Sequence, residues 1–146
     1  MRLPILLIAA SVALLAFAPA PLPRKERDVA NQTDVEGTWE FVECDSDGRP
    51  YLSTRDNYHA VITKQEFCFT PKSGGPGTTY VMRLDPRASP PAFTWSEGKQ
   101  VSYVGSYRLE NGRLTMIFSS GASVSARPTD FARRADWCYV LRRIRL

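Results

Sequence analysis

From Gly37 onward, apolar and polar residues alternate with a period of two, in short runs separated by clusters of glycine, proline, asparagine and aspartate. This alternation is typical of β-strands with one buried face, and no stretch keeps a helical period over three turns. The predicted strands are 37–44, 58–63, 66–70, 78–84, 91–96, 101–109, 113–119 and 137–145. We therefore expect an all-β fold, a small eight-stranded antiparallel up-and-down β-barrel, and the pattern leaves open whether the barrel closes completely.

The dipeptide Asn111-Gly112 predicts a tight hairpin, because a two-residue type I′ turn needs positive φ at both central positions. This turn sets a register in which Leu109 faces Leu114 and Gly105 faces Phe118. Gly105 is expected to leave room beside Phe118 where the barrel wall bends. One face of the hairpin is apolar and should face the core: Tyr103, Tyr107, Leu109, Leu114, Met116 and Phe118.

The first and last predicted strands can be paired in the same way. A register with Trp39 opposite Arg143 also places Phe41 opposite Leu141 and pairs Glu40 with Arg142. We expect the guanidinium of Arg143 to stack on the indole of Trp39 and to bind carbonyl oxygens at that barrel end, beside Gly37. The same register continues with three more pairs: Val42 with Val140, Glu43 with Tyr139, and Cys44 with Cys138.

Three cysteines leave two alternatives open. In the first, Cys44 and Cys138 form a disulfide across the seam between the first and last strands, and Cys68 is free. In the second, all three thiols are reduced, since a cross-strand disulfide is sterically demanding.

The N-terminal residues differ in character from the rest of the chain. Arg2 precedes an uncharged apolar run over 3–18, which predicts that residues 1–20 are a signal peptide or an N-terminal anchor. Residues 21–34 combine prolines with charges and are expected to form a tether, and 35–146 form the barrel domain. The domain is then exported to the periplasm, cell envelope or extracellular space, and is retained there if the anchor is not cleaved.

Charge adds a possible contact surface to this picture. The chain has a net charge of +4, and its last twenty residues contain six arginines. The simplest interpretation is a solubilising face, and the alternative is contact with an envelope protein or an anionic surface through Arg133, Arg134 and Arg145. Nucleic acid is not an expected partner of an exported protein.

Catalytic chemistry finds little support in the residues. His59 is the single histidine, and no nucleophile elbow surrounds a serine. The cysteines lack zinc-ligand spacing, so we predict neither a metal site nor a cofactor. A short helical turn is expected at 129–135, before the last strand.

Several motifs, taken in order, resemble a known family. The pieces are Gly37-Thr38-Trp39-Glu40, Asp47-Gly48, Leu84-Asp85-Pro86 with Pro90-Pro91, Gly105-Ser106-Tyr107-Arg108-Leu109 with Asn111-Gly112-Arg113-Leu114, and Arg127-Pro128-Thr129-Asp130-Phe131. Gly-x-Trp with a late arginine is similar to the lipocalin superfamily. The span from Val35 to Arg142 resembles a lipocalin-like domain family of unknown function that is expanded in planctomycete bacteria. The three cysteines and the arginines at 133–134 depart from the pattern of that family. The resemblance to the superfamily implies a barrel that binds a small apolar molecule.

Two functional hypotheses follow, with an unrecognised hydrolase as a distant third. The first is a non-enzymatic exported barrel that binds a small apolar ligand in its interior, and its candidate ligand-binding residues are Glu43, Tyr103, Tyr107, Met116, Phe118 and Tyr139. The second is an envelope scaffold or protein-interaction module with a packed core and an arginine-rich contact face. A continuous interior cavity above ~300 Å³ favours the first, and a filled core favours the second.

Overall fold

The computed structural model describes residues 35–51, 55–121, 123–132 and 136–145. All eight predicted strands are present within one or two residues of their expected ends. They are β1 (Gly37–Ser46), β3 (Tyr58–Ile62), β4 (Glu66–Pro71), β5 (Thr78–Asp85), β6 (Ala92–Glu97), β7 (Gln100–Glu110), β8 (Arg113–Ser120) and β9 (Trp137–Arg143). The predicted leader at 1–20 and tether at 21–34 lie outside the described residues.

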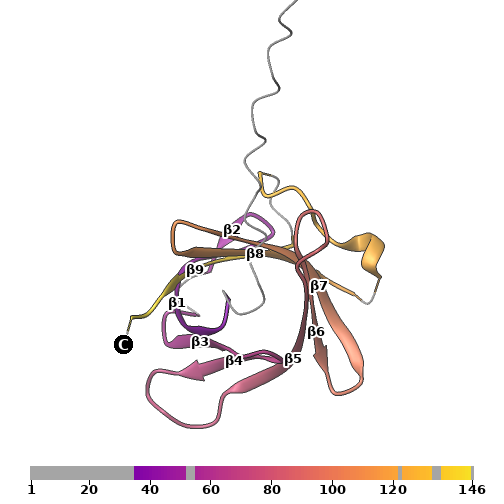
Figure 1. Ribbon diagram of the computed structural model, residues 1–146. Helices are drawn as coiled ribbons and strands as arrows, with labels where there is room; N and C mark the ends of the chain where they lie inside the picture. The colour runs from indigo at the N-terminus through magenta and orange to yellow at the C-terminus, as the bar shows by residue number, and fades with distance from the viewer. Residues whose placement is uncertain (1–34, 52–54, 122, 133–135, 146) are drawn as a thin grey trace, which may run out of the picture.

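The strands close into an antiparallel barrel (Figure 1). Each strand pairs with the next one along the chain from β3 to β9, and β1 pairs with both β3 and β9. The predicted all-β barrel is therefore confirmed, with complete closure. Over the described part of the chain, no helix combines the length and apolarity that a membrane-spanning helix needs.

Residues 45–50 form a small hairpin. A two-residue strand, β2 (Arg49–Pro50), folds back on the end of β1 and pairs with Ser46 and Asp45. Asp47 and Gly48 take positive φ values of 49° and 76°, the backbone that a type I′ turn requires.

The hairpin of β7 and β8 has the predicted register. Asn111 and Gly112 adopt φ values of 52° and 73°, and Gly105 lies opposite Phe118. A Cβ atom on Gly105 would lie 2.5 Å from the carbonyl oxygen of Ile117 and 2.5 Å from Cζ of Phe93. Glycine is needed here because the ring of Phe93 packs directly on the backbone.

The seam between β1 and β9 follows the predicted register only at its first three pairs. Trp39 faces Arg143, Glu40 faces Arg142 and Phe41 faces Leu141. A β-bulge then adds one residue to β1, so that Val42 and Glu43 together lie opposite Val140. The predicted pairing of Val42 with Val140 is therefore wrong, because Glu43 takes that place.

The bulge also changes the pairs beyond it. Glu43 does not face Tyr139, because Cys44 does, and Asp45 faces Cys138. A shift of one residue exchanges the two faces of a strand. Glu43 is consequently exposed on the barrel exterior, whereas Cys44 is buried in the core.

The predicted disulfide between Cys44 and Cys138 is not formed, and Cys44, Cys68 and Cys138 all carry reduced thiols. Cys138 lies between two inward-facing residues of β9, so its side chain is on the opposite face of the sheet from Cys44. Burial raises the pKa of the Cys44 thiol to about 12. The alternative of three reduced thiols fits this geometry.

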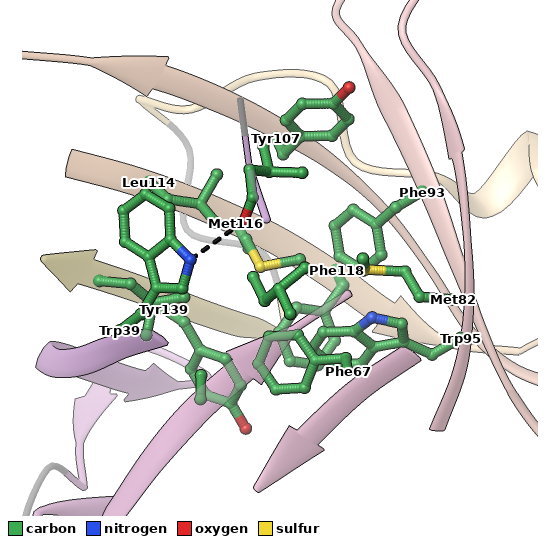
Figure 2. Packing of buried hydrophobic residues seen from close by; sticks show 14 of the residues in the cluster. Trp39, Phe67, Met82, Phe93, Trp95, Tyr107, Leu114, Met116, Phe118 and Tyr139 are labelled. Carbon is green, nitrogen blue, oxygen red and sulfur yellow. Dashed lines mark hydrogen bonds between the residues drawn. The ribbon is translucent and has the colours of Figure 1, made fainter. Parts of the chain in front are cut away.

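Aromatic rings fill the barrel interior (Figure 2). Trp95 is the centre of this packing, with its ring centroid 4.4 Å from that of Phe67, 4.8 Å from that of Phe118 and 5.0 Å from that of Phe93. Phe41 stacks on Phe69 at 5.7 Å. Such pairs contribute about 0.5–1.5 kcal/mol each beyond the area they bury.

One end of the barrel is closed by the residues that lead into β1. The indole nitrogen of Trp39 donates a hydrogen bond of 3.0 Å to the carbonyl oxygen of Val35, which is itself buried. The guanidinium of Arg143 lies 4.5 Å from the centroid of the Trp39 ring and donates to the carbonyl oxygen of Glu36 at 2.8 Å. The predicted stacking and carbonyl contact of Arg143 are both confirmed.

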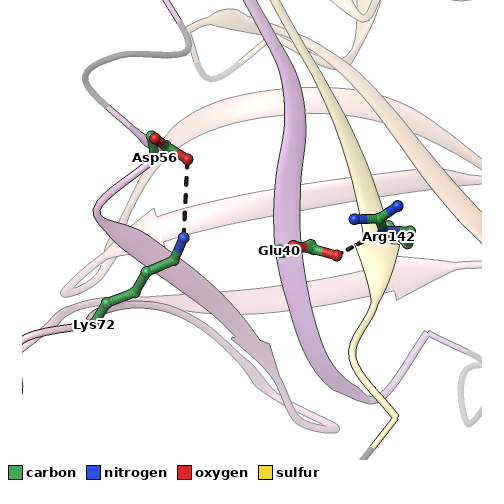
Figure 3. A network of polar contacts seen from close by, with 4 residues as sticks. All are labelled: Glu40, Asp56, Lys72 and Arg142. Carbon is green, nitrogen blue, oxygen red and sulfur yellow. Dashed lines mark hydrogen bonds and ion pairs between the residues drawn. The ribbon is translucent and has the colours of Figure 1, made fainter.

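The exterior of the seam carries an ion pair. Nε of Arg142 donates to a carboxylate oxygen of Glu40 at 2.6 Å, across the two strands (Figure 3). The hydrogen bond from Arg142 holds the pKa of Glu40 below its usual value. A second, longer pair of 3.9 Å joins Lys72 to Asp56, and the Asp56 side chain is more exposed than that of Glu40.

The connection from β8 to β9 crosses the outer face of β7, and we call its residues 123–132 the outer strap. The hydroxyl of Ser106 on β7 donates to the carbonyl oxygen of Pro128 at 2.5 Å. Arg127 donates to the carbonyl oxygen of Pro90 and to the Ser106 hydroxyl, both at 2.9 Å. The strap contains a short 3-10 helix, Val124–Ala126. Residues 129–132 are not helical, so the helical turn expected there is absent, and 133–135 lie outside the described residues.

Candidate functional site

The barrel end opposite Trp39 contains a small hollow, which we call the mouth hollow. Its volume is about 40 Å³. Its walls are aromatic except for one cation, and the lining residues are Arg55, Phe69, Tyr80, Trp95, Tyr103, Phe118, Trp137 and Tyr139. Strands β4 to β9 supply the rings, whereas Arg55 comes from the connection between β2 and β3.

Arg55 is held over the hollow by aromatic rings. Its guanidinium carbon lies 4.5 Å from the ring centroid of Phe69 and 5.9 Å from those of Tyr51 and Tyr139. Burial opposes its charge, but the neighbouring tyrosines outweigh burial, so the pKa of Arg55 lies above its usual value. The side chain is therefore a half-buried, permanent cation.

The polar atoms around Arg55 are incompletely paired. The ion pairs seen among the described residues join Lys72 to Asp56, Arg108 to Glu110 and Arg142 to Glu40, and Arg55 takes part in none of them. Hydrogen bonds with Tyr51 and Tyr139 help to hold the charge of Arg55, but its Nε is buried and has no hydrogen-bond partner within the described structure. The same is true of the indole nitrogen of Trp95.

The tyrosines at this end keep their protons at neutral pH. Burial raises the pKa of Tyr51, Tyr80 and Tyr139 above the usual value of 10.0. Their hydroxyl groups are thus available as hydrogen-bond donors. Of these tyrosines, Tyr80 and Tyr139 line the mouth hollow together with the Arg55 cation, and no carboxylate lines it among the residues described.

Only three of the six predicted ligand-binding residues line the mouth hollow. Tyr103, Phe118 and Tyr139 line the mouth hollow. Tyr107 and Met116 are each 1% exposed in the packed core and do not line it. Glu43, the sixth residue, was predicted to be a polar anchor at the mouth and lies on the outside of the barrel, because the bulge turned its side chain outward.

Sequence reasoning missed Arg55, Tyr80, Trp95 and Trp137 as parts of one site. The three aromatic residues lie on predicted strands and were unremarkable there. Arg55 follows an irregular connection in which no periodic pattern gives the direction of a side chain. Aromatic residues near the ends of predicted strands were the one available signal.

A second depression lies on the barrel exterior, and we call it the outer groove. It measures about 640 Å³, and Val42, Thr115 and Val140 contribute to its walls from three adjacent strands. Phe131 of the outer strap also lines it, with the guanidinium of Arg108 4.7 Å from the Phe131 ring centroid.

The predicted basic contact residues can be placed only in part. Arg145 is exposed just after the end of β9, whereas Arg133 and Arg134 lie outside the described residues. His59 is half-buried on β3, opposite Glu40 of β1. Within the described residues, no three histidine, cysteine or acidic side chains are grouped in a way that would hold a metal ion.

Comparison with known proteins found no match among protein-family models, curated proteins or solved structures.

Proposed function

We propose that this protein is a non-enzymatic barrel module of the cell envelope that acts through its outer surface. The observation that supports this function is the filled interior. Rings from most of the strands meet at the barrel axis, and the mouth hollow of about 40 Å³ is far below the ~300 Å³ of a typical ligand pocket. An apolar molecule of lipid size would have to displace the packed core around Trp95.

The outer groove is the contact surface that we assign to this function. Its lining includes the apolar side chains of Val42 and Val140, the acidic Glu43 and the basic Arg108. Interfaces of this kind have an apolar centre and a charged rim. A partner that presents an apolar segment flanked by charges of both signs would fit it. Arg145 adds a basic residue beyond the end of β9.

Site-specific photo-crosslinking in envelope extracts tests the proposal. A photoreactive amino acid at Thr115, in the groove, should crosslink to one discrete protein. The matched position is Val81, which is 42% exposed on β5, on the opposite side of the strand order. Equal crosslinking from both positions, or none from Thr115, would refute the outer groove as a contact surface.

Charge reversal separates the apolar and the basic contributions to partner binding. Arg145→Glu should weaken the crosslink from position 115 without lowering the melting temperature, because the residue is exposed. Arg87→Glu is the control, since Arg87 is also exposed but follows β5. The basic contact is wrong if both reversals have the same effect on the crosslink.

A further inference from the structure

We propose that the mouth end of the barrel is a binding site for a guanidinium group, that Arg55 occupies this site from within the chain, and that an arginine of a partner protein can take its place. The site is separate from the outer groove. It needs no cavity in the packed interior, because the place of the Arg55 side chain is itself the site. Three features carry the inference: the rings around the cation, the missing counter-charge and the position of Arg55 in the chain.

The rings are the first feature. The guanidinium carbon of Arg55 lies 4.5 Å from the ring centroid of Phe69 and 5.9 Å from those of Tyr51 and Tyr139. All of these distances fall within the roughly 6 Å over which a ring attracts a cation. Several rings around one cation are the arrangement by which proteins recognise cationic ligands. We call the side chains of Phe69, Tyr51 and Tyr139 the cation cage.

The missing counter-charge is the second feature. A buried charge in a protein is usually paired with an opposite charge, because an uncompensated one costs free energy. Arg55 takes part in none of the ion pairs seen among the described residues, and none of the described residues that line the mouth hollow is acidic. Its charge is held by the rings and by hydrogen bonds with the hydroxyl groups of Tyr51 and Tyr139. Such a cage holds a guanidinium less firmly than a buried ion pair would, so its occupant can be exchanged.

The position of Arg55 is the third feature. Phe69 and Tyr139 belong to β4 and β9 of the barrel wall, whereas Arg55 lies in the connection between β2 and β3. Its side chain can therefore leave the cage without unpairing any strand. Arg55 is also half-buried, so its place is reached from solvent.

The present occupant indicates the chemistry of the ligand. A guanidinium is planar, is always charged and stacks on ring faces, whereas an ammonium group is compact and more strongly hydrated. Arg55 is tethered to the barrel and so has a high effective concentration at the cage. A second arginine displaces it only when further contacts hold that arginine in place, and a partner protein supplies such contacts. We therefore assign the cage to an arginine side chain of a partner.

Titration of full-length Arg55→Ala with ethylguanidine tests the cage. The substitution removes the internal occupant, and millimolar ethylguanidine should raise the melting temperature of the variant saturably, because a ligand that binds only the folded state stabilises it. Ethylurea has nearly the same shape without the charge and should bind at least tenfold more weakly. Acetyl-argininamide carries the same group on an arginine and should bind as well as ethylguanidine.

Competition and a matched pair of variants locate the binding. The wild type should bind ethylguanidine at least tenfold more weakly than Arg55→Ala, because Arg55 fills the cage. In the Arg55→Ala protein, an added Phe69→Leu should weaken binding about tenfold, since it removes the ring nearest to the cation. An added Phe93→Leu is the control, because Phe93 is a buried ring that does not line the mouth hollow, and binding should stay unchanged.

The proposal fails if ethylguanidine does not stabilise Arg55→Ala saturably, if ethylurea stabilises it equally, or if the wild type binds as tightly as the variant. It also fails if Phe69→Leu and Phe93→Leu have the same effect. Absence of binding by acetyl-argininamide would refute an arginine side chain as the ligand. If Arg55→Ala does not fold, Arg55→Gln takes its place in the titration, and the same outcomes decide.

Discussion

Replacing Gly105 by alanine tests the close packing of the barrel wall. Gly105 has no positive φ, so alanine meets no backbone strain, and its lower unfolded-state entropy would by itself stabilise the protein by about 0.4–1 kcal/mol. The structure instead predicts that the substitution destabilises the protein. The new Cβ would lie 2.5 Å from both the Ile117 carbonyl oxygen and Cζ of Phe93, closer than real Cβ contacts come.

The expected magnitude follows from which neighbour can move. Overpacking costs typically 1–3 kcal/mol. The Ile117 carbonyl belongs to β8, which is paired on both sides, and Phe93 is 1% exposed between Trp95 and Phe118. Neither can yield easily, so we expect a loss of about 3 kcal/mol. For a domain of this size that corresponds to a fall in melting temperature of roughly 10 °C or more.

Urea unfolding followed by tryptophan fluorescence measures this loss. Gly74→Ala is the comparison for a glycine without neighbours, because its Cβ would meet no atom within 4 Å; it should lose only the roughly 1–2 kcal/mol of a positive φ. Adding Phe93→Leu to Gly105→Ala should recover part of the loss, as a favourable coupling of about 1 kcal/mol. If Gly105→Ala is as stable as the wild type, or if the two changes are additive, the close contact is wrong.

Three further predictions concern the seam and the thiols. Arg143→Met should lower the free energy of unfolding in urea by about 2 kcal/mol, because the variant loses a charged hydrogen bond to the Glu36 carbonyl and the stacking on the Trp39 indole. A variant as stable as the wild type would contradict this prediction. Since Arg142 lowers the pKa of Glu40, the stability that this carboxylate contributes is complete above its usual value of 4.5 and is lost as the pH falls through the lowered pKa. Glu40→Gln should flatten that acid-side slope of stability against pH, and an unchanged slope would contradict the assignment. Cys44, with its pKa raised to about 12, should be the slowest thiol to react with iodoacetamide by mass spectrometry, and fast native labelling would show that it is not buried.

The strands and the strong turn could be predicted because local chemistry determines them. Alternation of apolar and polar residues is a direct consequence of the two faces of a strand, and Asn111-Gly112 suits one turn geometry. The pairing of Trp39 with Arg143 followed from requiring apolar and charged neighbours to match at the same time. These features need no knowledge of the rest of the fold.

The bulge could not be predicted from the sequence. At the bulge two successive residues of β1 face outward, and because one is apolar and the other charged, the alternation of apolar and polar residues is not visibly interrupted. Val42 and Glu43 fit the exterior equally well in this barrel. All the errors at the seam follow from that one additional residue, including the disulfide and the place of Glu43.

The mouth hollow and the outer strap are tertiary features. Arg55 meets Phe69 and Tyr139 only once the barrel has closed. The strap did leave a signal, since Val104 and Ile117 are apolar residues on the outer face of predicted strands, and both are 1% exposed in the structure. An apolar residue on the exterior of a strand indicates that some other part of the chain covers it.

The pairing of β1 with β9 also determines when the barrel can fold. The ion pair of Glu40 with Arg142 joins residues 102 positions apart, and the contact of Arg143 with Glu36 joins residues 107 apart. During synthesis β1 therefore waits for its partner until all the other strands have been made. Such long-range closure slows folding, and β1 and β8 present unpaired edges in the meantime. A chain that stops before Trp137 would keep both edges and should aggregate.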